Sequence, residues 1–189
     1  ESQGMTNFMK ELKPDCLEDI IAGVSLYRPG PMDQIPRYIA NKKDPEHAVY
    51  THPALKPILE VTYGCMVYQE QVMQIVRDLA GYSLGRADLV RRAMGKKKLD
   101  VMAKEREIFI HGQTDENGNI VVPGCIRNGI DEQSANKIFD EMAEFAKYAF
   151  NKSHAAAYAV VSYRTAYLKA YYPTEFMAAM LTSVMDIST

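Results

Sequence analysis

The sequence predicts a mainly α protein with one or two small β-hairpins. In most segments, apolar residues recur every three or four positions, as in the run from Leu17 to Val24. Residues that favour helix N-termini, such as Asp131, stand directly before several of these segments. The strongest hairpin signal is the pair Asn117-Gly118, which β-prone residues follow. Together these observations favour a helical bundle over a sheet-based fold.

Composition is that of an ordinary globular chain. The 189 residues are 47% hydrophobic and 24% charged, with a net charge of -2. That length suffices for one sizeable core in one or two domains. No run approaches the roughly 20 apolar residues of a membrane span, and no secretory signal opens the chain. Since the first residue is Glu1, we expect a piece of a longer polypeptide.

Apolar periodicity, caps and breakers place the elements along the chain. The predicted helices cover residues 6–13, 15–27, 37–42, 70–79, 86–98, 101–112, 132–150, 153–171 and 175–185. The predicted N-terminal caps are Asp15, Ser83, Asp100, Asp131, Ser153 and Thr174. Breakers are expected to end helices at Pro14, Gly81 and Pro173, and to make 28–36 a turn region. Residues 44–53 are expected to form a loop, 65–68 a short strand and 113–130 a hairpin.

A cluster of basic residues lies on the predicted helix 86–98. Five basic side chains fall within eight residues: Arg91, Arg92, Lys96, Lys97 and Lys98. Helical spacing puts Ala87, Val90, Ala93 and Met94 on the apolar face. Arg92 and Lys96 then project side by side from the opposite face, with Arg91 at its boundary. Such a pair suits a polyphosphate or a nucleic-acid backbone, and the alternative is a solvated basic face.

A second polar cluster, "YAFNKSHAAAY", spans residues 148–158. If Ser153 caps the following helix, the free amides at 154–156 form a helix N-terminus that favours anions. Lys152 adds a full positive charge, and Asn151 supplies short-range hydrogen bonds. His154 stands beside an alanine run that permits close approach. An ordinary helix cap with an exposed lysine is the alternative.

Three further features limit the chemistry. Arg28, beside the Pro29-Gly30-Pro31 turn, could bind phosphate or pair with an acid. The sequence contains no D-x-D pair, P-loop or G-x-G-x-x-G, so carboxylates for two-metal chemistry are not predicted here. The three cysteines form no CxxC pair, which argues against a zinc site or a disulfide framework. The tyrosines of 158–172 and methionines of 177–185 recur at helical spacing, which predicts a core or helix–helix interface.

Five blocks resemble one family in order and in residues. They are "ESQGM", "SLYRPGPM", "YGCMVYQEQVM", "GYSLGRADLVRRAMGKKK" and "FNKSHAAAYAVVSYRTAYLKAYYPTEFMAA". In this order the blocks resemble the bacterial C-family replicative polymerases, the DNA polymerase III alpha subunits. The resemblance covers nearly the whole chain, residues 1–189, and implies part of the multi-helix fingers domain. The palm, thumb and C-terminal domains would lie outside it, and 113–130 would be a variable insertion.

The resemblance also implies roles for particular residues. Arg91 and Arg92 match the basic helix near the incoming triphosphate, with Lys96 behind them. Residues 151–154, which are Asn151, Lys152, Ser153 and His154, match the loop and helix start that line the nucleotide pocket. His154 would lie near the sugar, and Arg28 would approach the nucleotide or brace its loop.

What the resemblance implies for activity is a nucleotide- and template-gripping module of a DNA-directed DNA polymerase. Its Mg²⁺ ligands would lie on the palm, so the isolated chain is expected to be inactive. The implied partners are the primer–template, the incoming deoxynucleoside triphosphate, the palm and thumb, and the sliding clamp and other replisome subunits. No membrane is implied, and the location would be cytoplasmic. The alternatives are a helical module that binds the DNA backbone and one that docks replisome proteins, both without a nucleotide pocket.

Overall fold

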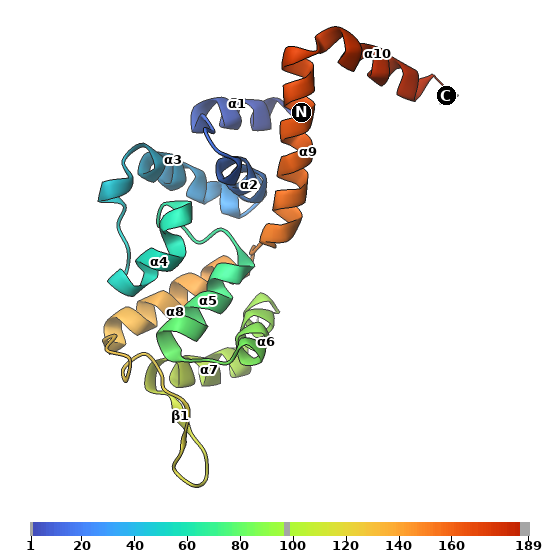
Figure 1. Cartoon of the computed structure of the whole chain (residues 1–189). Helices are drawn as coiled ribbons and strands as arrows, with labels where there is room; N and C mark the ends of the chain where they lie inside the picture. The colour runs from blue at the N-terminus through green and yellow to red at the C-terminus, as the bar shows by residue number, and fades with distance from the viewer. Residues whose placement is uncertain (1, 97–98, 186–189) are drawn as a thin grey trace.

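The computed structural model describes residues 2–96 and 99–185, and it is mainly helical with one small antiparallel sheet (Figure 1). The predicted fold class is therefore confirmed. The α-helices are α1 (Gln3–Leu12), α2 (Leu17–Leu26), α3 (Ile35–Lys43), α4 (Lys56–Leu59), α5 (Gln69–Ala80), α6 (Leu84–Gly95), α7 (Leu99–His111), α8 (Glu132–Ala146), α9 (Lys152–Tyr171) and α10 (Pro173–Val184). Short 3₁₀ turns are η1 (Pro31–Gln34), η2 (Pro45–His47), η3 (Pro53–Leu55) and η4 (Glu60–Thr62). The strands are β1 (Gln113–Thr114) and β2 (Ile120–Val122).

Several predicted helix ends are confirmed. The Ser83 hydroxyl caps α6 by accepting from the amide of Arg86, and the Asp131 carboxylate caps α8 by accepting from the amide of Ser134. Gly81 ends α5 in the left-handed conformation, with φ 78°. Local sequence sufficed here because each capping group binds the backbone of its own helix.

Other predicted ends are wrong. Helix α2 has Cys16 at its N-cap, while the main chain of Asp15 donates to the carboxylate of Asp19. Asp100 lies inside α7, and α10 begins at Pro173 rather than after Thr174. The helix predicted for 132–150 ends at Ala146, and α9 begins at Lys152 with Asn151, not Ser153, as its N-cap. In place of a strand at 65–68, one parallel bridge joins Tyr68 to Phe150.

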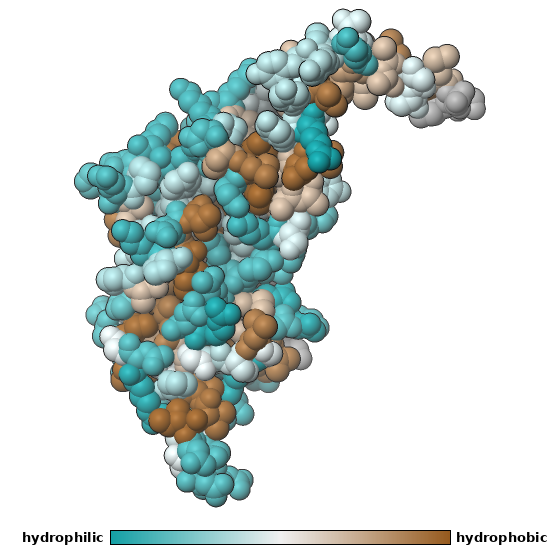
Figure 2. Space-filling model, in the orientation of Figure 1, coloured by the Kyte–Doolittle hydropathy of each residue, from teal (hydrophilic) through white to brown (hydrophobic). Residues whose placement is uncertain are grey.

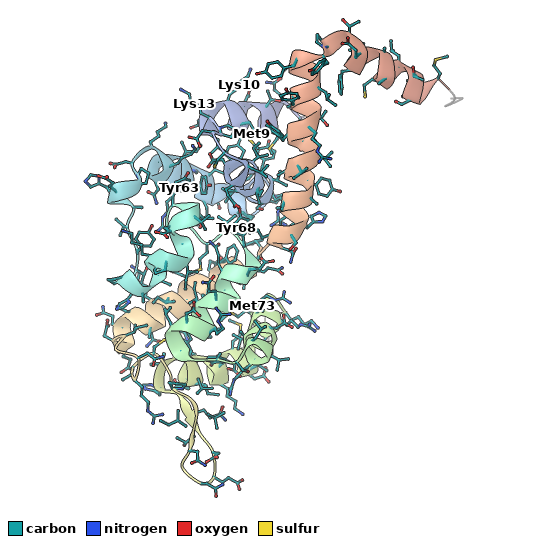
Figure 3. All side chains as sticks on the ribbon, viewed as in Figure 1. Met9, Lys10, Lys13, Tyr63, Tyr68 and Met73 are labelled. Carbon is teal, nitrogen blue, oxygen red and sulfur yellow. The ribbon has the colours of Figure 1, made fainter. Side chains whose placement is uncertain are left out.

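The buried residues form two clusters. One cluster belongs to helices α4–α8 and the segment after β2, and includes Val76, Phe109 and Phe139. The other joins α1, α2, α3 and the first turns of α9, and includes Leu26 and Tyr38. We call these parts the α4–α8 lobe and the α1–α3 lobe. In Figure 1 the α1–α3 lobe lies above the α4–α8 lobe. Figure 3 places Tyr68 between them, at the start of α5.

The sequence predicted that the tyrosines of 158–172 and the methionines of 177–185 form a core or a helix–helix interface. Among the described residues this prediction is wrong, because most of these side chains are exposed. Helix α9 packs along α2, burying Ala155 and Ala159, and then projects from the body together with α10 (Figure 1). The exposed large side chains of the two helices are Tyr158, Val161, Tyr163, Tyr167, Leu168, Tyr171, Met177, Met180, Leu181 and Val184. Figure 2 shows apolar residues exposed along the end of this arm. Periodicity marked a surface for packing, but the described residues include no element that covers it.

The hairpin predicted for 113–130 is present at residues 113–122, while 123–130 forms turns without a strand. Strands β1 and β2 pair antiparallel, and the Asp115 carboxylate orders the turn by accepting from the amides of Asn117 and Asn119. That 113–130 varies between relatives stays a prediction. Among the described residues, no helix combines the length and apolar content that a membrane crossing requires.

Candidate functional site

The segment 148–152 links α8 to α9 and is held through three successive carbonyls. Arg28 Nη2 donates to Tyr148 O at 2.7 Å, and Gln69 Nε2 donates to Ala149 O at 3.0 Å. The main-chain amide of Gln69 donates to Phe150 O at 2.9 Å. We call this segment the strap. Because each of the three carbonyls has a partner from another element, the strap is a fixed part of the structure.

Arg28, two residues past the end of α2, braces the strap. Its Nε donates to Ser25 O at 3.2 Å, and its guanidinium lies 4.0 Å from the centre of the Phe150 ring. Burial lowers the pKa of Arg28 from its ordinary value. Of the two roles expected for Arg28, bracing is therefore the one that these contacts fit.

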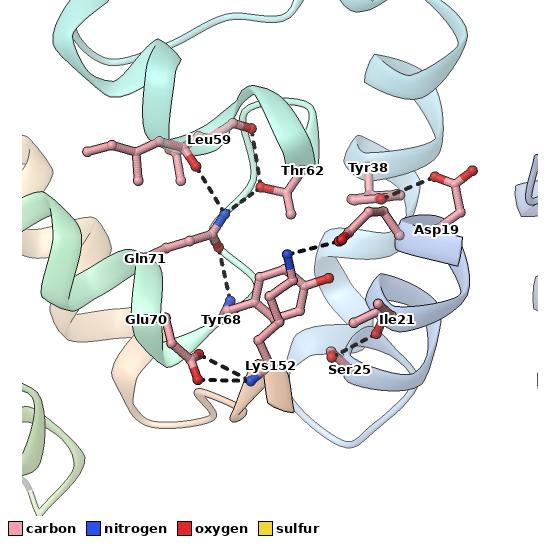
Figure 4. A network of polar contacts seen from close by, with 12 residues as sticks. Asp19, Ile21, Ser25, Tyr38, Leu59, Thr62, Tyr68, Glu70, Gln71 and Lys152 are labelled. Carbon is pink, nitrogen blue, oxygen red and sulfur yellow. Dashed lines mark hydrogen bonds and ion pairs between the residues drawn. The ribbon is translucent and has the colours of Figure 1, made fainter. Parts of the chain in front are cut away.

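The start of α9 is not the open anion socket that the sequence predicted. The Asn151 side chain accepts from the amide of His154 at 3.0 Å, and the amide of Ala155 donates to Asn151 O. The carboxylate of Glu70, from α5, accepts from Asn151 Nδ2 at 2.8 Å. It also accepts from the amide of Lys152 at 3.1 Å, a contact that Figure 4 shows. An acid of the chain itself thus occupies the position that favours an anion.

The side chain of Lys152 turns toward α2. Its Nζ lies 3.0 Å from Glu18 Oε2 and 5.2 Å from the centre of the Tyr68 ring. The Tyr68 hydroxyl is buried without a hydrogen-bond partner among the described residues. Its pKa is raised mainly by burial and, to a smaller extent, by the negative charge of nearby acids such as Glu18. The Lys152 side chain is 34% exposed, so this ion pair lies at the surface of the protein.

The apolar face of α6 is as predicted, but the helix ends at Gly95, so Lys96 is its C-cap and not a residue of the helix. Ala87, Val90, Ala93 and Met94 are buried, as expected. Arg91 Nη2 binds Asp88 Oδ1 at 2.7 Å, and Arg92 Nε lies 2.7 Å from the other oxygen of Asp88. The hydrogen bond from Arg91 lowers the pKa of Asp88. The Arg92 side chain is 62% exposed, so its remaining donors face solvent.

The remaining predicted residues are on the surface. Lys96 is exposed at the C-terminal end of α6, while Lys97 and Lys98 lie outside the described residues. Ser153 is exposed in the first turn of α9. The exposed His154 ring packs between the rings of Phe150 and Tyr158, with centroids 5.3 and 4.7 Å away. This packing orients the imidazole toward the outside of α9.

One residue that the sequence did not single out joins the two basic elements. Gln69 Oε1 accepts from Arg91 Nη1 at 3.0 Å, while the same carboxamide holds Ala149 O. Arg91 is therefore connected to the strap, which includes Asn151 and Lys152. Among the described residues, no hydrogen bond or ion pair joins Arg92 or Lys96 to the strap. The signal for Gln69 and its neighbour Glu70 was weak, because two polar residues at a helix start normally face solvent.

Two other places are poor candidates for nucleotide or metal. A cleft of about 450 Å³ between the lobes is lined by Asp33, Glu141 and Glu144 as well as Arg37, and its carboxylates disfavour a triphosphate. Within the part of the chain that the structure describes, the one group spaced for a metal is Asp15, Cys16 and Asp19. Lys42 Nζ lies 2.8 Å from Asp15 and 3.0 Å from Asp19, in the place that a cation would take. This donor set does not fit the Mg²⁺ pair of a polymerase.

Comparison with known proteins identifies the family. Residues 1–117 match the family model described as the bacterial DNA polymerase III alpha subunit finger domain. The chain is 54% identical to the DNA polymerase III subunit alpha of Pasteurella multocida, over 98% of this chain and 16% of that protein. It is 54% identical to the Thermus aquaticus subunit over 96% of this chain and 14% of that protein. The Escherichia coli subunit is 51% identical over 98% of this chain and 16% of its own length.

These relatives also cover the strap and α9, which lie beyond the family-model match. The chain spans 14–16% of the length of the curated relatives named above. Since the family model matches residues 1–117 of 189, the chain belongs to the finger domain family of the bacterial DNA polymerase III alpha subunit.

Proposed function

We propose that this chain is the nucleotide- and template-gripping fingers module of a template-directed DNA polymerase that synthesises DNA in the 5′–3′ direction. The observation that carries the proposal is the carboxamide of Gln69, which binds Arg91 on α6 and Ala149 in the strap. Through it the basic face of α6 and the start of α9 belong to one unit, as a single nucleotide site requires.

The chemistry follows from charge and position. Arg91, Arg92 and Lys152 neutralise negative charge on the triphosphate of the incoming nucleotide, with Lys96 adding to the local positive potential. Asn151 and Ser153 shape the start of α9, and Arg28 holds the strap in place. His154 faces the sugar. Holding the α-phosphate in line with the primer 3′-hydroxyl lowers the entropic part of the barrier.

Metal chemistry belongs to the rest of the polymerase. Mg²⁺ would supply Lewis-acid activation at the phosphates, and its carboxylate ligands would lie on the palm. The isolated chain is therefore expected to incorporate no nucleotide. The proposed partners are the primer–template, the nucleotide, the palm and thumb of the same polypeptide, and the sliding clamp and other replisome subunits through other parts of that polypeptide, in the cytoplasm.

Arg92→Ala in the full-length polymerase tests the proposal. Losing charge-assisted contacts to phosphate should reduce kcat/KM for the nucleotide about 10- to 100-fold. The melting temperature should change little, because Arg92 is 62% exposed and pairs only with Asp88 on its own helix. Arg77→Ala is the matched control, since Arg77 is a half-exposed arginine that pairs with its neighbour Asp78 on α5. The proposal fails if kcat/KM is the same in both variants.

The same variants separate the alternative of a DNA-backbone module. In that case Arg92→Ala would weaken primer–template binding and reduce its salt dependence, while the nucleotide KM would stay unchanged. Under the proposal, the nucleotide KM rises and the primer–template dissociation constant stays close to that of the parent. The two quantities are measured in one steady-state titration and one binding titration.

The exposed tyrosines of α9 favour a docking role for that helix. Tyr163 is 53% and Tyr171 70% exposed, as the docking alternative predicts. A chain that spans 14–16% of its relatives also exposes every surface that packs on the remaining polypeptide. Docking through α9 is therefore compatible with a nucleotide site at its first turn, at the opposite end of the helix.

A further inference from the structure

We infer that Gln69 and Glu70, the first two residues of α5, are positioning residues that hold the basic helix α6 and the start of α9 in one fixed arrangement. The inference rests on the proposed function, because it assigns these residues to the same nucleotide site. Neither residue need touch the nucleotide. They act through Arg91, the strap and the first turn of α9.

Gln69 uses both ends of its carboxamide. Oε1 accepts from Arg91 Nη1 at 3.0 Å, and Nε2 donates to Ala149 O at 3.0 Å. Its main-chain amide adds a third bond, to Phe150 O. A carboxamide side chain can accept from a guanidinium and donate to a carbonyl at once, whereas an ionised carboxylate can only accept. The residue type therefore matches the two tasks.

Glu70 holds the next two residues of the strap, Asn151 and Lys152. Its carboxylate accepts from Asn151 Nδ2. It also accepts from the amide of Lys152, the first residue of α9, as Figure 4 shows. The negative charge is favourable beside the positive end of the helix dipole. Because this amide is occupied, we expect the triphosphate to be held by side chains and not by the Lys152 backbone amide.

Held in this way, α6 and α9 move together. Gln69 lies between Arg91 and the strap, and its carboxamide binds Arg91 at one end and Ala149 O at the other. Releasing Gln69 leaves the Arg91–Asp88 pair intact, so the helix keeps its local ion pair but loses its link to the strap. The expected defect is a misplaced cation, seen in nucleotide binding, and not an unfolded domain.

Gln69 variants of the full-length polymerase test the first half. Gln69→Met removes both side-chain bonds at similar volume, and Gln69→Glu keeps the acceptor for Arg91 but loses the donor to Ala149. Both should raise the nucleotide KM about three- to tenfold, with smaller changes in kcat and melting temperature. Gln74→Met, on the same helix and without a hydrogen bond in the structure, is the matched control. A fall in melting temperature with unchanged KM for both Gln69 variants would overturn the inference.

A double-mutant cycle shows whether Gln69 acts through Arg91. If it does, Gln69→Met should raise KM by less in an Arg91→Ala background than in the parent, because the cation that it positions is gone. Equal fold-changes in the two backgrounds would mean that Gln69 acts independently of Arg91, and would contradict this step.

Glu70 is tested by rescue. Glu70→Ala should raise the nucleotide KM, while Glu70→Gln, whose carbonyl oxygen can still accept from Asn151 and Lys152, should restore most of the loss. Two outcomes are kept apart by the arginine variants. If Arg91→Ala and Arg92→Ala leave KM unchanged, the proposed function fails. If they raise KM but the Gln69 and Glu70 variants leave it unchanged, only the positioning inference fails.

Discussion

Lys42 Nζ lies 3.0 Å from the carboxylate of Asp19, whose side chain is only 1% exposed. The hydroxyls of Tyr38 and Tyr63 also point at this carboxylate, at 3.5 and 3.4 Å. Figure 4 shows Asp19 and Tyr38 in this contact, with Lys152 nearby. The pair joins α3 to α2, the helix along which α9 packs, so it supports the scaffold of the candidate site from behind.

Lys42→Met should destabilise the protein strongly. Removing the cation leaves Asp19 buried without its charge partner, which costs about 3–5 kcal/mol in comparable sites. Urea unfolding at neutral pH measures this loss. Lys43→Met is the control, because Lys43 is the exposed neighbour on the same helix and has no ion pair in the structure. Equal stabilities of the two variants would show that the buried pair contributes nothing.

Gln71→Met should also destabilise, for a different reason. The Gln71 side chain is buried and accepts from the amides of Val67 and Tyr68 at 2.8 and 3.0 Å, while it donates to the Thr62 hydroxyl at 2.8 Å. Methionine preserves the volume but leaves the buried amides of Val67 and Tyr68 without this acceptor, for a loss of about 3 kcal/mol. Gln74→Met, measured in the same denaturant titration, should change stability by much less, and a similar loss there would contradict the account.

Asp131 predicts a pH dependence. Its hydrogen bond with Ser134 lowers its pKa below the ordinary 3.8. The folded state therefore favours the ionised form, and the stabilisation is present above the unfolded pKa and is lost as pH falls through the folded value. Asp131→Asn keeps a capping oxygen without the charge. The melting temperatures of the parent and the Asp131→Asn variant should differ at neutral pH and converge as the pH falls below 3.8; a difference that is constant with pH would refute the assignment.

The three thiols should differ in reactivity. Burial raises the pKa of Cys65 to about 11 and that of Cys125 to about 12, and both side chains are buried. Cys16 is exposed at the N-cap of α2. Iodoacetamide at neutral pH should therefore modify Cys16 first, and the other two only after unfolding. Mass spectrometry of peptides counts the labels, and early labelling of Cys125 would show that the α4–α8 lobe opens readily.

The sequence predicted what is decided within one helix. The caps at Ser83 and Asp131, and the buried face of α6 formed by Ala87, Val90 and Met94, need only neighbours three or four positions away. The N-cap of α9 shows the limit of prediction from local sequence. Asn151 and Ser153 are both good capping residues, and Glu70, which lies 81 positions away along the chain, binds Asn151. No local pattern contains that contact.

The residues of the candidate site also fall into those that the sequence identified and those that it missed. Clustering of charge identified Arg91, Arg92 and Lys152, because cations that bind phosphate are visible as residue types. Gln69 and Glu70 were missed, since their importance lies in what they join. The tyrosines of α9 were assigned to a core because periodicity reports that one face prefers apolar contact. It does not report whether the partner surface lies within the same chain.

The 20 residues of α9 make a rod about 30 Å long, fixed at its first turn by the strap and Glu70. A rigid rod held at one end converts rotation into displacement. A tilt of about 10° at the first turn would move the far end by about 5 Å at this length. Whatever contacts the exposed tyrosines is thereby mechanically connected to the place where Lys152 and His154 stand. A small rotation at the start of α9 would therefore reach the far end of the helix as a displacement of several ångströms.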